Sequence, residues 1–190
     1  DTGDLNETVP FIEGRALNYD EESYYDLPTR SGESATLYQH CVRAITHGLR
    51  FGEHGLPFIG SCDWNDGMDK VGQHGKGESV WLAFFLYDIL IKFADIARLQ
   101  NDPDFTARCE AEAATLKQNI HKNAWDGGWY RRAYFDDGTP LGSAENSECQ
   151  IDSLSQSWSV LSGAGDPERS KMGMNAADQR LVHRDKKLIQ

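Results

Sequence analysis

The sequence predicts an all-α fold with one short β-hairpin between its helices. Apolar residues recur at helical spacing in the segments 34–51, 79–99, 103–123, 151–163 and 167–180. Strand-like alternation of aromatic residues is confined to residues 129–140. Glycine-rich polar loops separate the helices, so the order of amphipathic helix, polar loop and helix recurs along the chain. We therefore expect a helical architecture with functional residues in its loops and no extensive sheet.

Residues 1–30 are the least regular part of the sequence, and we expect them to form an extended arm. They are acidic and contain Tyr19, Tyr24 and Tyr25 without any periodicity. Long structureless segments are uncommon inside compact domains. The arm could therefore cover a substrate, or its aromatic residues could serve only in packing.

The helix boundaries are marked by residues that start and stop helices. Ser34 is a plausible cap and Gly52 a plausible stop for the first helix, and Asp102–Pro103 opens the third, because proline is tolerated at the first helical position. The second helix is apolar around most of its first half, which is typical of a helix buried between two layers. Trp81 in this helix is expected to lie in the core.

The hairpin at 129–140 is an aromatic strand closed by an Asp-Gly turn. Trp129 and Tyr130 are neighbours on the expected strand. Since side chains alternate between the two faces of a strand, one of the two should face inward and the other outward.

The balance of charge narrows the range of partners. The chain has 19 Lys and Arg residues against 30 Asp and Glu residues, a formal net charge of −11 at pH 7. Such a charge disfavours nucleic acid and anionic membranes. A neutral sugar is indifferent to it, whereas a phosphate needs a site built locally from cations or backbone amides.

The cysteines and the apolar runs bear on cellular location. Cys41, Cys62, Cys109 and Cys149 are scattered, which predicts free thiols and no metal site. The longest apolar run, 80–90, is shorter than the roughly 20 residues that a bilayer requires, and no signal peptide opens the chain. A cytoplasmic location is expected, although a parent protein could carry a membrane anchor outside this segment.

The segment 55–69 carries the residues best suited to chemistry. Asp63, Trp64, Asn65 and Asp66 follow one another, and the surrounding glycines and proline favour a loop. An indole packs on the C–H face of a sugar, fixed polar groups bind hydroxyls, and a carboxyl can protonate a glycosidic oxygen. The loop therefore suggests a carbohydrate site, the alternative being an Asx-rich turn in which Trp64 fills the core.

Four blocks of sequence follow one another in a characteristic order: GLPFIGSCDWNDGMDKVG, GKGESVWLAFFL, WDGGWYRRAYFDDGTPLGS and ECQIDSLSQSWSVLSGAG. They resemble glycoside hydrolase family ninety-four, which contains cellobiose and chitobiose phosphorylases and the phosphorylase-like domain of cyclic β-1,2-glucan synthases. The glucan synthase branch is particularly similar. The resemblance implies that residues 1–190 are one segment from the centre of a catalytic (α/α)6 barrel.

The resemblance also implies a site. Asp66 corresponds to the family's general acid, Trp64 to a residue that lines the subsite of the transferred sugar, and Glu148 to a residue that contacts the acceptor sugar. Asp63 and Asn65 are expected to shape the loop. The substrate-binding residues expected in total are Trp64, Glu148, Asp63, Asn65 and Gln150.

The reaction implied is inverting phosphorolysis of a β-glucoside or β-1,2-glucan with release of α-glucose 1-phosphate. An inverting hydrolase needs a second carboxylate to activate water. In phosphorolysis inorganic phosphate is itself the nucleophile, so one acid is sufficient. We expect no metal and no cofactor; the partners are an oligosaccharide or β-glucan and phosphate as co-substrate, and not nucleic acid.

The chain also departs from the family pattern. An upstream R-D-x-x-Q-type block, a downstream threonine-glycine block that binds phosphate, and a β-sandwich domain are not found in this sequence. The isolated chain is therefore expected to be inactive. It is also expected to self-associate through uncovered apolar flanks around Trp81, Phe84 and Phe85.

Two other functions stay open. One is an inverting hydrolase with Asp66 as acid and Asp63, Asp69 or Glu148 as base. The other is a non-catalytic segment that binds carbohydrate through its aromatic residues.

Four cations could in principle hold phosphate: Arg131, Arg132, His74 and Lys76. The resemblance places the family's phosphate-binding residues elsewhere. An exposed pair of arginines bound to Asp136 or Asp137 is therefore the favoured interpretation of Arg131 and Arg132.

Overall fold

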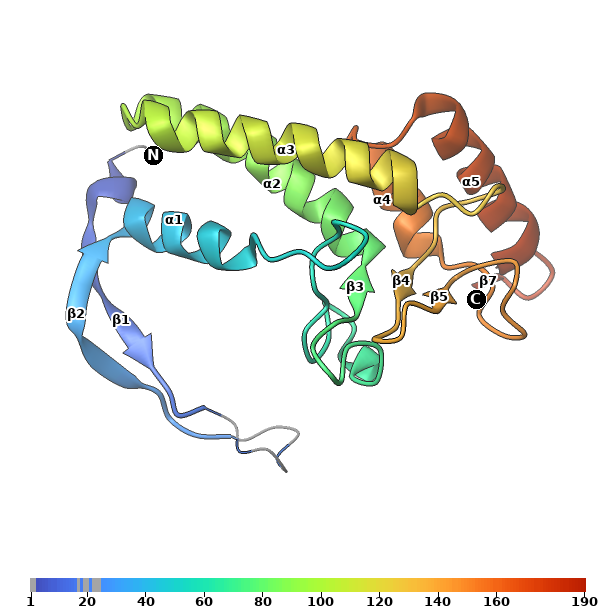
Figure 1. Cartoon of the computed structure of the whole chain (residues 1–190), viewed down its shortest axis with the longest axis horizontal. Helices are drawn as coiled ribbons and strands as arrows, with labels where there is room; N and C mark the ends of the chain where they lie inside the picture. Colours follow the sequence, from blue (N-terminus) through green and yellow to red (C-terminus); the bar gives the residue numbers. More distant parts are fainter. Residues whose placement is uncertain (1–2, 17, 19–20, 22–24) are drawn as a thin grey trace. The chain divides into compact units, whose positions relative to one another are not determined.

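A computed structural model describes residues 3–190 apart from residues 17, 19–20 and 22–24. The chain forms two compact units, Asp1–His47 and Gly48–Gln190 (Figure 1). Tyr19 and Tyr24 of the expected arm lie outside the described residues. Tyr25 is fully exposed, so it has no packing role in the first unit.

The helices agree closely with the sequence prediction in number and position. They are α1 (Leu37–Gly48), α2 (Val80–Leu99), α3 (Pro103–Asn123), α4 (Ser153–Leu161) and α5 (Pro167–Leu181), with the short 3-10 helices η1 (Asp4–Asn6) and η2 (Asp66–Met68). The strands are β1 (Thr8–Glu13), β2 (Thr29–Thr36), β3 (Glu78–Ser79), β4 (Ala133–Tyr134), β5 (Pro140–Leu141), β6 (Val182–His183) and β7 (Leu188–Ile189). No described helix combines the length and the apolar character that a membrane span requires.

The first unit is a two-stranded antiparallel sheet followed by α1. β1 pairs with β2, and Ser34, the expected cap of the first helix, is a strand residue opposite Pro10. The helix therefore begins three residues later than predicted, at Leu37. Phe11 of β1 stacks on His40 of α1 with 3.8 Å between ring centroids. The sheet and α1 thus belong to one compact unit, Asp1–His47, and the extended arm at 1–30 stays a prediction.

In the second unit, α2 and α3 lie side by side (Figure 1). Ser79 caps α2 by accepting the amide of Leu82, and Asp102 caps α3 by accepting the amide of Phe105. Trp81 is buried, as predicted for a core residue. The four cysteines, two of which lie in this unit's loops, are free, which confirms the expected thiols.

A three-stranded sheet lies at the start of α2. β4 and β5 form the predicted hairpin, and β3 joins it as a third strand that the sequence did not predict. Trp129 and Tyr130 are both buried, so the prediction that one of them faces outward is wrong. The cause is local: Tyr130 bridges to Trp125, and the Trp129 indole donates to the carbonyls of Gly142 and Gln150 at 2.9 and 2.8 Å.

Gln156 fastens α4 to the segment before the hairpin. Its side-chain oxygen accepts the Tyr130 amide at 2.8 Å, and its amide nitrogen donates to the Tyr130 carbonyl at 2.7 Å. α5 packs closely on this pair, because a Cβ at Gly173 would lie 2.5 Å from the Gln156 oxygen. The segment between the hairpin and α4 is thereby held against the core.

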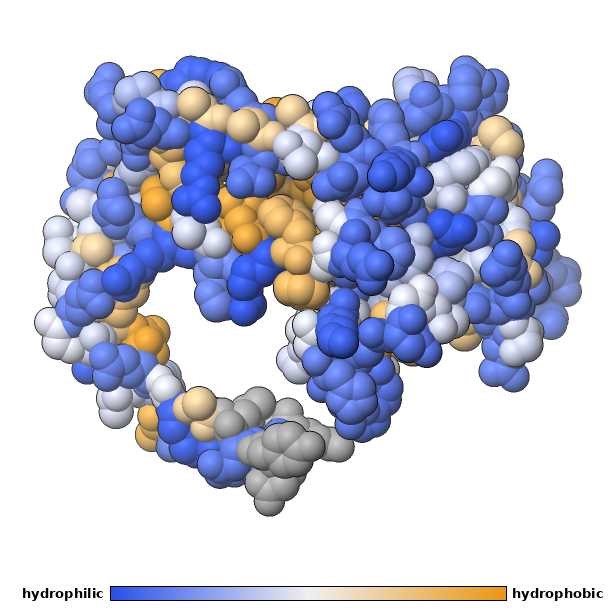
Figure 2. Space-filling model, in the orientation of Figure 1, coloured by the Kyte–Doolittle hydropathy of each residue, from blue (hydrophilic) through white to orange (hydrophobic). Residues whose placement is uncertain are grey.

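Apolar side chains remain exposed on the second unit, and Figure 2 shows apolar surface along α2. The exposed large apolar residues of α2 and α4 are Ile91, Leu99, Val160 and Leu161. The prediction that Trp81 and Phe84 form an uncovered flank is wrong, since both are buried. Trp158 of α4 packs edge-on to Trp81 with ring centroids 6.1 Å apart. Self-association of the isolated chain stays a prediction.

Candidate functional site

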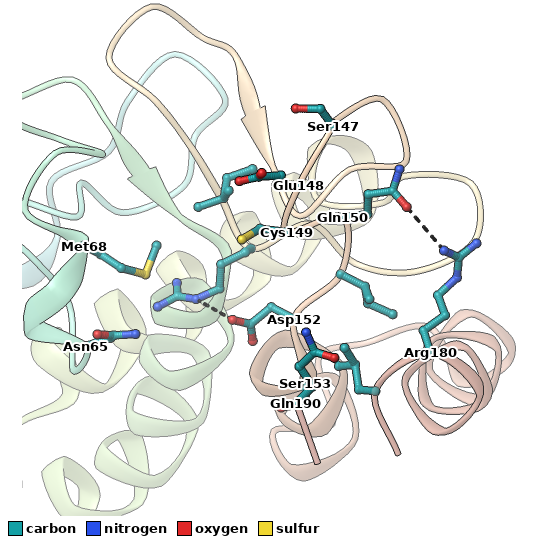
Figure 3. A pocket seen from close by; sticks show the side chains of 14 residues that line it. Asn65, Met68, Ser147, Glu148, Cys149, Gln150, Asp152, Ser153, Arg180 and Gln190 are labelled. Atoms are coloured by element: carbon teal, nitrogen blue, oxygen red, sulfur yellow. Dashed lines mark hydrogen bonds and ion pairs between the residues drawn. The ribbon is translucent and has the colours of Figure 1, made fainter. Parts of the chain in front are cut away.

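A cavity of about 640 Å³ lies in the second unit, a volume that suits a small ligand. Figure 3 shows Asn65 and Met68 on one side of it, Gln150 and Arg180 on the other, and Asp152 between them. Its other lining residues are Arg132, Leu141, Ser147, Glu148, Cys149, Ile151, Ser153, Leu181 and Gln190. The predicted residues Asn65, Glu148 and Gln150 are therefore brought together around one cavity.

The site loop, residues 61–69, is folded by its own Asx side chains. Asp63 accepts the amide of Asn65 at 3.1 Å, and Asn65 accepts the amide of Gly67 at 3.0 Å and so caps η2. These are Asx turns, which fix short loops by mimicking backbone hydrogen bonds. Asp66 is exposed at the start of η2, and the Cys62 thiol lies 3.8 Å from its carboxylate oxygen.

Trp64 and Asp66 are not among the residues that line this cavity, and their predicted roles stay predictions. Asn65 has extended backbone angles, φ −94° and ψ 100°. Side chains of consecutive residues in extended backbone point to opposite sides. The side chain of Asn65 therefore faces the cavity and that of Trp64, with 62% of its surface exposed, faces solvent. Asp66 begins η2 and is exposed as well.

Asp63 forms a buried ion pair with Arg132. Their side chains are 0% and 2% exposed, and the guanidinium contacts both carboxylate oxygens, at 2.7 and 2.8 Å. Ser79 donates its hydroxyl to Asp63 at 2.8 Å. The side chain of Asp63 is fully covered in this structure and supports the loop, the shaping role that the sequence predicts for it, while its contact with substrate stays a prediction.

The electrostatics of Asp63 follow from this pairing. Burial would raise the pKa of its carboxyl, but the hydrogen bonds and charge of Arg132, together with Ser79 and the amide of Asn65, outweigh burial and hold the pKa below its ordinary value of 3.8. The carboxylate form is thus the one that fits the folded loop.

Acid should therefore loosen the site loop. Because the folded-state pKa of Asp63 is lowered, its contribution to stability is fully present above the ordinary value of 3.8 and is lost as the pH falls through the folded value. Asp63→Asn should remove this contribution, so the loss of thermal stability between pH 6 and pH 3 should be smaller in the variant. If Asp63→Asn lost as much thermal stability between pH 6 and pH 3 as the unmodified protein, Asp63 would not be the source of this pH dependence.

The glycine-rich loop 72–77 holds a carboxylate of its own chain. Asp136 accepts the backbone amides of His74, Lys76 and Gly77 at 2.8, 2.7 and 3.0 Å. Burial would raise the pKa of Asp136, but these amides outweigh it and lower the pKa. These three backbone amides are therefore already bound by a carboxylate of the chain itself.

The two arginines of the hairpin do not form the expected exposed pair with Asp136 or Asp137. Arg131 pairs with Asp126 at 2.9 Å. Arg132 is buried against Asp63 instead. The predicted partners of these arginines are therefore wrong, because both acids that bind them lie outside the hairpin.

Arg180 and Asp152 were missed by the sequence reasoning. Arg180 of α5 lies over the Trp129 ring at 4.5 Å and donates to the side-chain oxygen of Gln150 at 3.4 Å (Figure 3). The Gln150 amide nitrogen donates to the Asn146 carbonyl at 2.9 Å. Gln150 is thereby held at both ends of its amide. Among the described residues, no three His, Cys, Asp or Glu side chains gather into a group that could hold a metal ion.

Comparison with known proteins identifies the family to which this site belongs. Residues 5–189 match the family described as "Glycosyl hydrolase 94 superfamily, catalytic domain". The chain is 46% identical over 186 residues to cyclic beta-(1,2)-glucan synthase NdvB of Rhizobium meliloti strain 1021, a match that covers 97% of this chain and 7% of that protein.

Two phosphorylases are also similar to this chain. Solabiose phosphorylase of Paenibacillus borealis is 34% identical over 186 residues, covering 95% of this chain and 22% of that protein. N,N'-diacetylchitobiose phosphorylase of Vibrio proteolyticus is 30% identical over 179 residues, a match that covers 91% of this chain and 22% of that protein. The chain thus spans between 7% and 22% of the length of these three relatives.

Proposed function

Because the chain belongs to the glycosyl hydrolase 94 catalytic-domain superfamily, we propose that it carries the general acid of an inverting glycoside phosphorylase domain. It is part of a carbohydrate-active enzyme, as its glycoside phosphorylase relatives indicate. The described residues are mostly helical with small sheets, and we propose that they form the central part of an (α/α)6 barrel. A cytoplasmic location is also part of the proposal.

One observation carries the assignment of roles. A buried ion pair fixes the site loop, which leaves the carboxyl of Asp66 and the indole of Trp64 free at its surface while Asn65 faces the cavity. Glu148 and Gln150 line the same cavity from the segment before α4. The loop thus offers an acid and an aromatic platform on either side of Asn65 in the chain, and the cavity that Asn65 lines offers polar groups for a second sugar.

In the proposed reaction, Asp66 in its protonated form donates a proton to the glycosidic oxygen as the bond breaks. Inorganic phosphate attacks the anomeric carbon from the opposite face, so a β-glucoside gives α-glucose 1-phosphate. Trp64 supports the transferred glucose, and Glu148 contacts the acceptor sugar. The similarity to a cyclic beta-(1,2)-glucan synthase favours β-1,2-linked glucose as the substrate.

A hydrolase would need a second carboxylate as base. Asp63 cannot serve, because its side chain is buried and paired with Arg132. Asp69 and Glu148 are the two remaining carboxylates of that alternative. The structure thus narrows the hydrolase hypothesis to two possible bases.

The presence or absence of phosphate tests the proposal. The full-length protein that carries this chain should release glucose 1-phosphate from a β-1,2-linked gluco-oligosaccharide at a rate that saturates with phosphate, and it should release no sugar without phosphate. Free glucose formed at the same rate without phosphate would indicate a hydrolase. Binding of the oligosaccharide without turnover in either condition would indicate a non-catalytic segment.

A further inference from the structure

We propose that Arg132 is a positioning residue that joins the site loop to the opposite wall of the cavity and thereby sets where Asp66 lies. The proposal rests on the proposed function for the role of Asp66. The position of Arg132 in the fold, its partners and its contrast with Arg131 support it.

On one side, Arg132 holds the site loop. Its two terminal nitrogens contact the two oxygens of Asp63 at 2.7 and 2.8 Å, a bidentate geometry that fixes orientation as well as distance. Asp63 in turn accepts the amide of Asn65, the residue directly before Asp66. The guanidinium therefore acts on Asp66 through the backbone of the loop.

On the other side, Arg132 reaches Asp152, as the dashed line to Asp152 in Figure 3 shows. The guanidinium Nε lies 3.5 Å from a carboxylate oxygen of Asp152, and among the described residues this buried Nε–H makes no hydrogen bond. Asp152 also caps α4 by accepting the amide of Leu154 at 2.6 Å. One cation thus links the loop to the start of the helix behind Glu148 and Gln150.

The backbone of Arg132 is itself fixed. Its amide donates to the carbonyl of Leu141 at 2.8 Å, and its carbonyl accepts the amide of Val80 at 3.1 Å. Gly142 approaches so closely, at φ +76°, that a Cβ there would lie 2.6 Å from the Arg132 nitrogen. The side chain is therefore held from a rigid base between the hairpin and α2.

Lysine cannot reproduce this arrangement. An ammonium is a point charge, whereas the planar guanidinium spans two carboxylate oxygens and presents a third N–H to another acid. Arg132→Lys keeps the positive charge opposite Asp63 but loses the bidentate contact with the two carboxylate oxygens. It should let the loop rotate without removing the buried charge pair.

Arg131 provides a matched control. It is the adjacent residue, and it also pairs with an acid, Asp126 at 2.9 Å, and donates to the hydroxyl of Tyr134 at 2.9 Å. The side chain also donates to the carbonyl of Asn123, so its partners lie at the end of α3, just after it and in β4, and none of them belongs to the site loop. Loss of the Arg131 guanidinium should disturb these contacts without moving Asp66.

The experiment compares Arg132→Lys with Arg131→Lys in the full-length protein. Arg132→Lys should lower kcat by about ten- to a hundredfold with a smaller change in KM, since a small misplacement of a catalytic group is costly. Arg131→Lys should keep a kcat close to that of the unmodified protein. Equal losses of kcat in the two variants would mean that Arg132 is only structural, and would overturn the proposal.

A second readout does not depend on activity. In protein labelled with 5-fluorotryptophan, the ¹⁹F resonance of Trp64, assigned with Trp64→Phe, reports on the site loop. It should shift or broaden in Arg132→Lys and stay in place in Arg131→Lys. An unchanged Trp64 resonance in Arg132→Lys would overturn the positioning role of Arg132, whether or not the wild-type protein is active. Absence of phosphorolysis in the wild-type protein would overturn only the proposed function.

If Arg132→Lys fails to fold, the double variant Arg132→Met with Asp63→Leu replaces it. Removing both members of a buried pair avoids leaving an uncompensated charge. The double variant should fold, and its kcat should remain low with the Trp64 resonance altered. Recovery of normal kcat in this variant would show that the ion pair does not position Asp66.

Discussion

Replacing Asp66 by asparagine should lower the rate of phosphorolysis by about 10²- to 10⁴-fold, the range expected for loss of a general acid. Asparagine has nearly the same size but carries no proton that it can transfer. Because Asp66 is exposed, the change should leave folding and sugar affinity almost unaffected. Steady-state kcat and KM, measured with the melting temperature, check all three expectations.

The choice of substrate makes this test specific for proton donation. A β-glucoside with an acidic phenol as leaving group needs no protonation to depart, so Asp66→Asn should cleave it at nearly the wild-type rate. A variant that is equally slow on activated and natural substrates would contradict the role of Asp66 as acid and indicate a disturbed site instead.

Asp69→Asn is the matched control in the same loop. Asp69 is half exposed and pairs with Lys70 at 3.3 Å. The same chemical change at this position should leave phosphorolysis intact. A large loss at Asp69 instead would favour the hydrolase alternative, in which a second carboxylate is required.

Local signals in the sequence were sufficient to place the helices. Asp102 with Pro103 starts α3 as predicted, and Asp166 with Pro167 starts α5 in the same way, because each aspartate side chain accepts an amide of the first turn and each proline fits the first helical position. These interactions lie within four residues of one another. They can therefore be inferred without knowledge of the fold.

Long-range partners were not predictable from such signals. Arg132 and Asp63 are 69 residues apart, and nothing in either local pattern shows that they form a buried pair. The same holds for β1 and β2, whose pairing takes Ser34 away from its expected role as a helix cap. Side-chain direction in the site loop was also missed, because it depends on the extended backbone at Asn65.

The loop at residues 52–56, which precedes the site loop, is held by a second buried acid, Glu78. Its side chain is 2% exposed, and its carboxylate accepts the amides of His54 at 3.1 Å and of Leu56 at 3.0 Å. His54 Nδ1 lies 2.5 Å from the same carboxylate, and the imidazole stacks on Tyr134 at 3.7 Å. Gly52 leaves room for the Glu78 side chain, since a Cβ at position 52 would lie 2.5 Å from the Glu78 carboxyl carbon.

Glu78→Ala should therefore lower the free energy of unfolding by about 3 to 5 kcal/mol, because it leaves the buried amide of Leu56 and the partly buried amide of His54 without an acceptor and removes the partner of the His54 imidazole. Urea denaturation of the full-length protein measures the total, and hydrogen exchange at the amides of His54 and Leu56 reports on the loop alone. Glu53→Ala removes the same charge from an exposed position in this loop and should change neither quantity measurably. Equal exchange rates at His54 in Glu78→Ala and in the unmodified protein would show that the carboxylate does not hold the loop. Other contacts would then be sufficient, among them the Asn119 and Asn123 side-chain amides, which donate to the carbonyls of Gly55 and His54 at 3.0 and 2.6 Å.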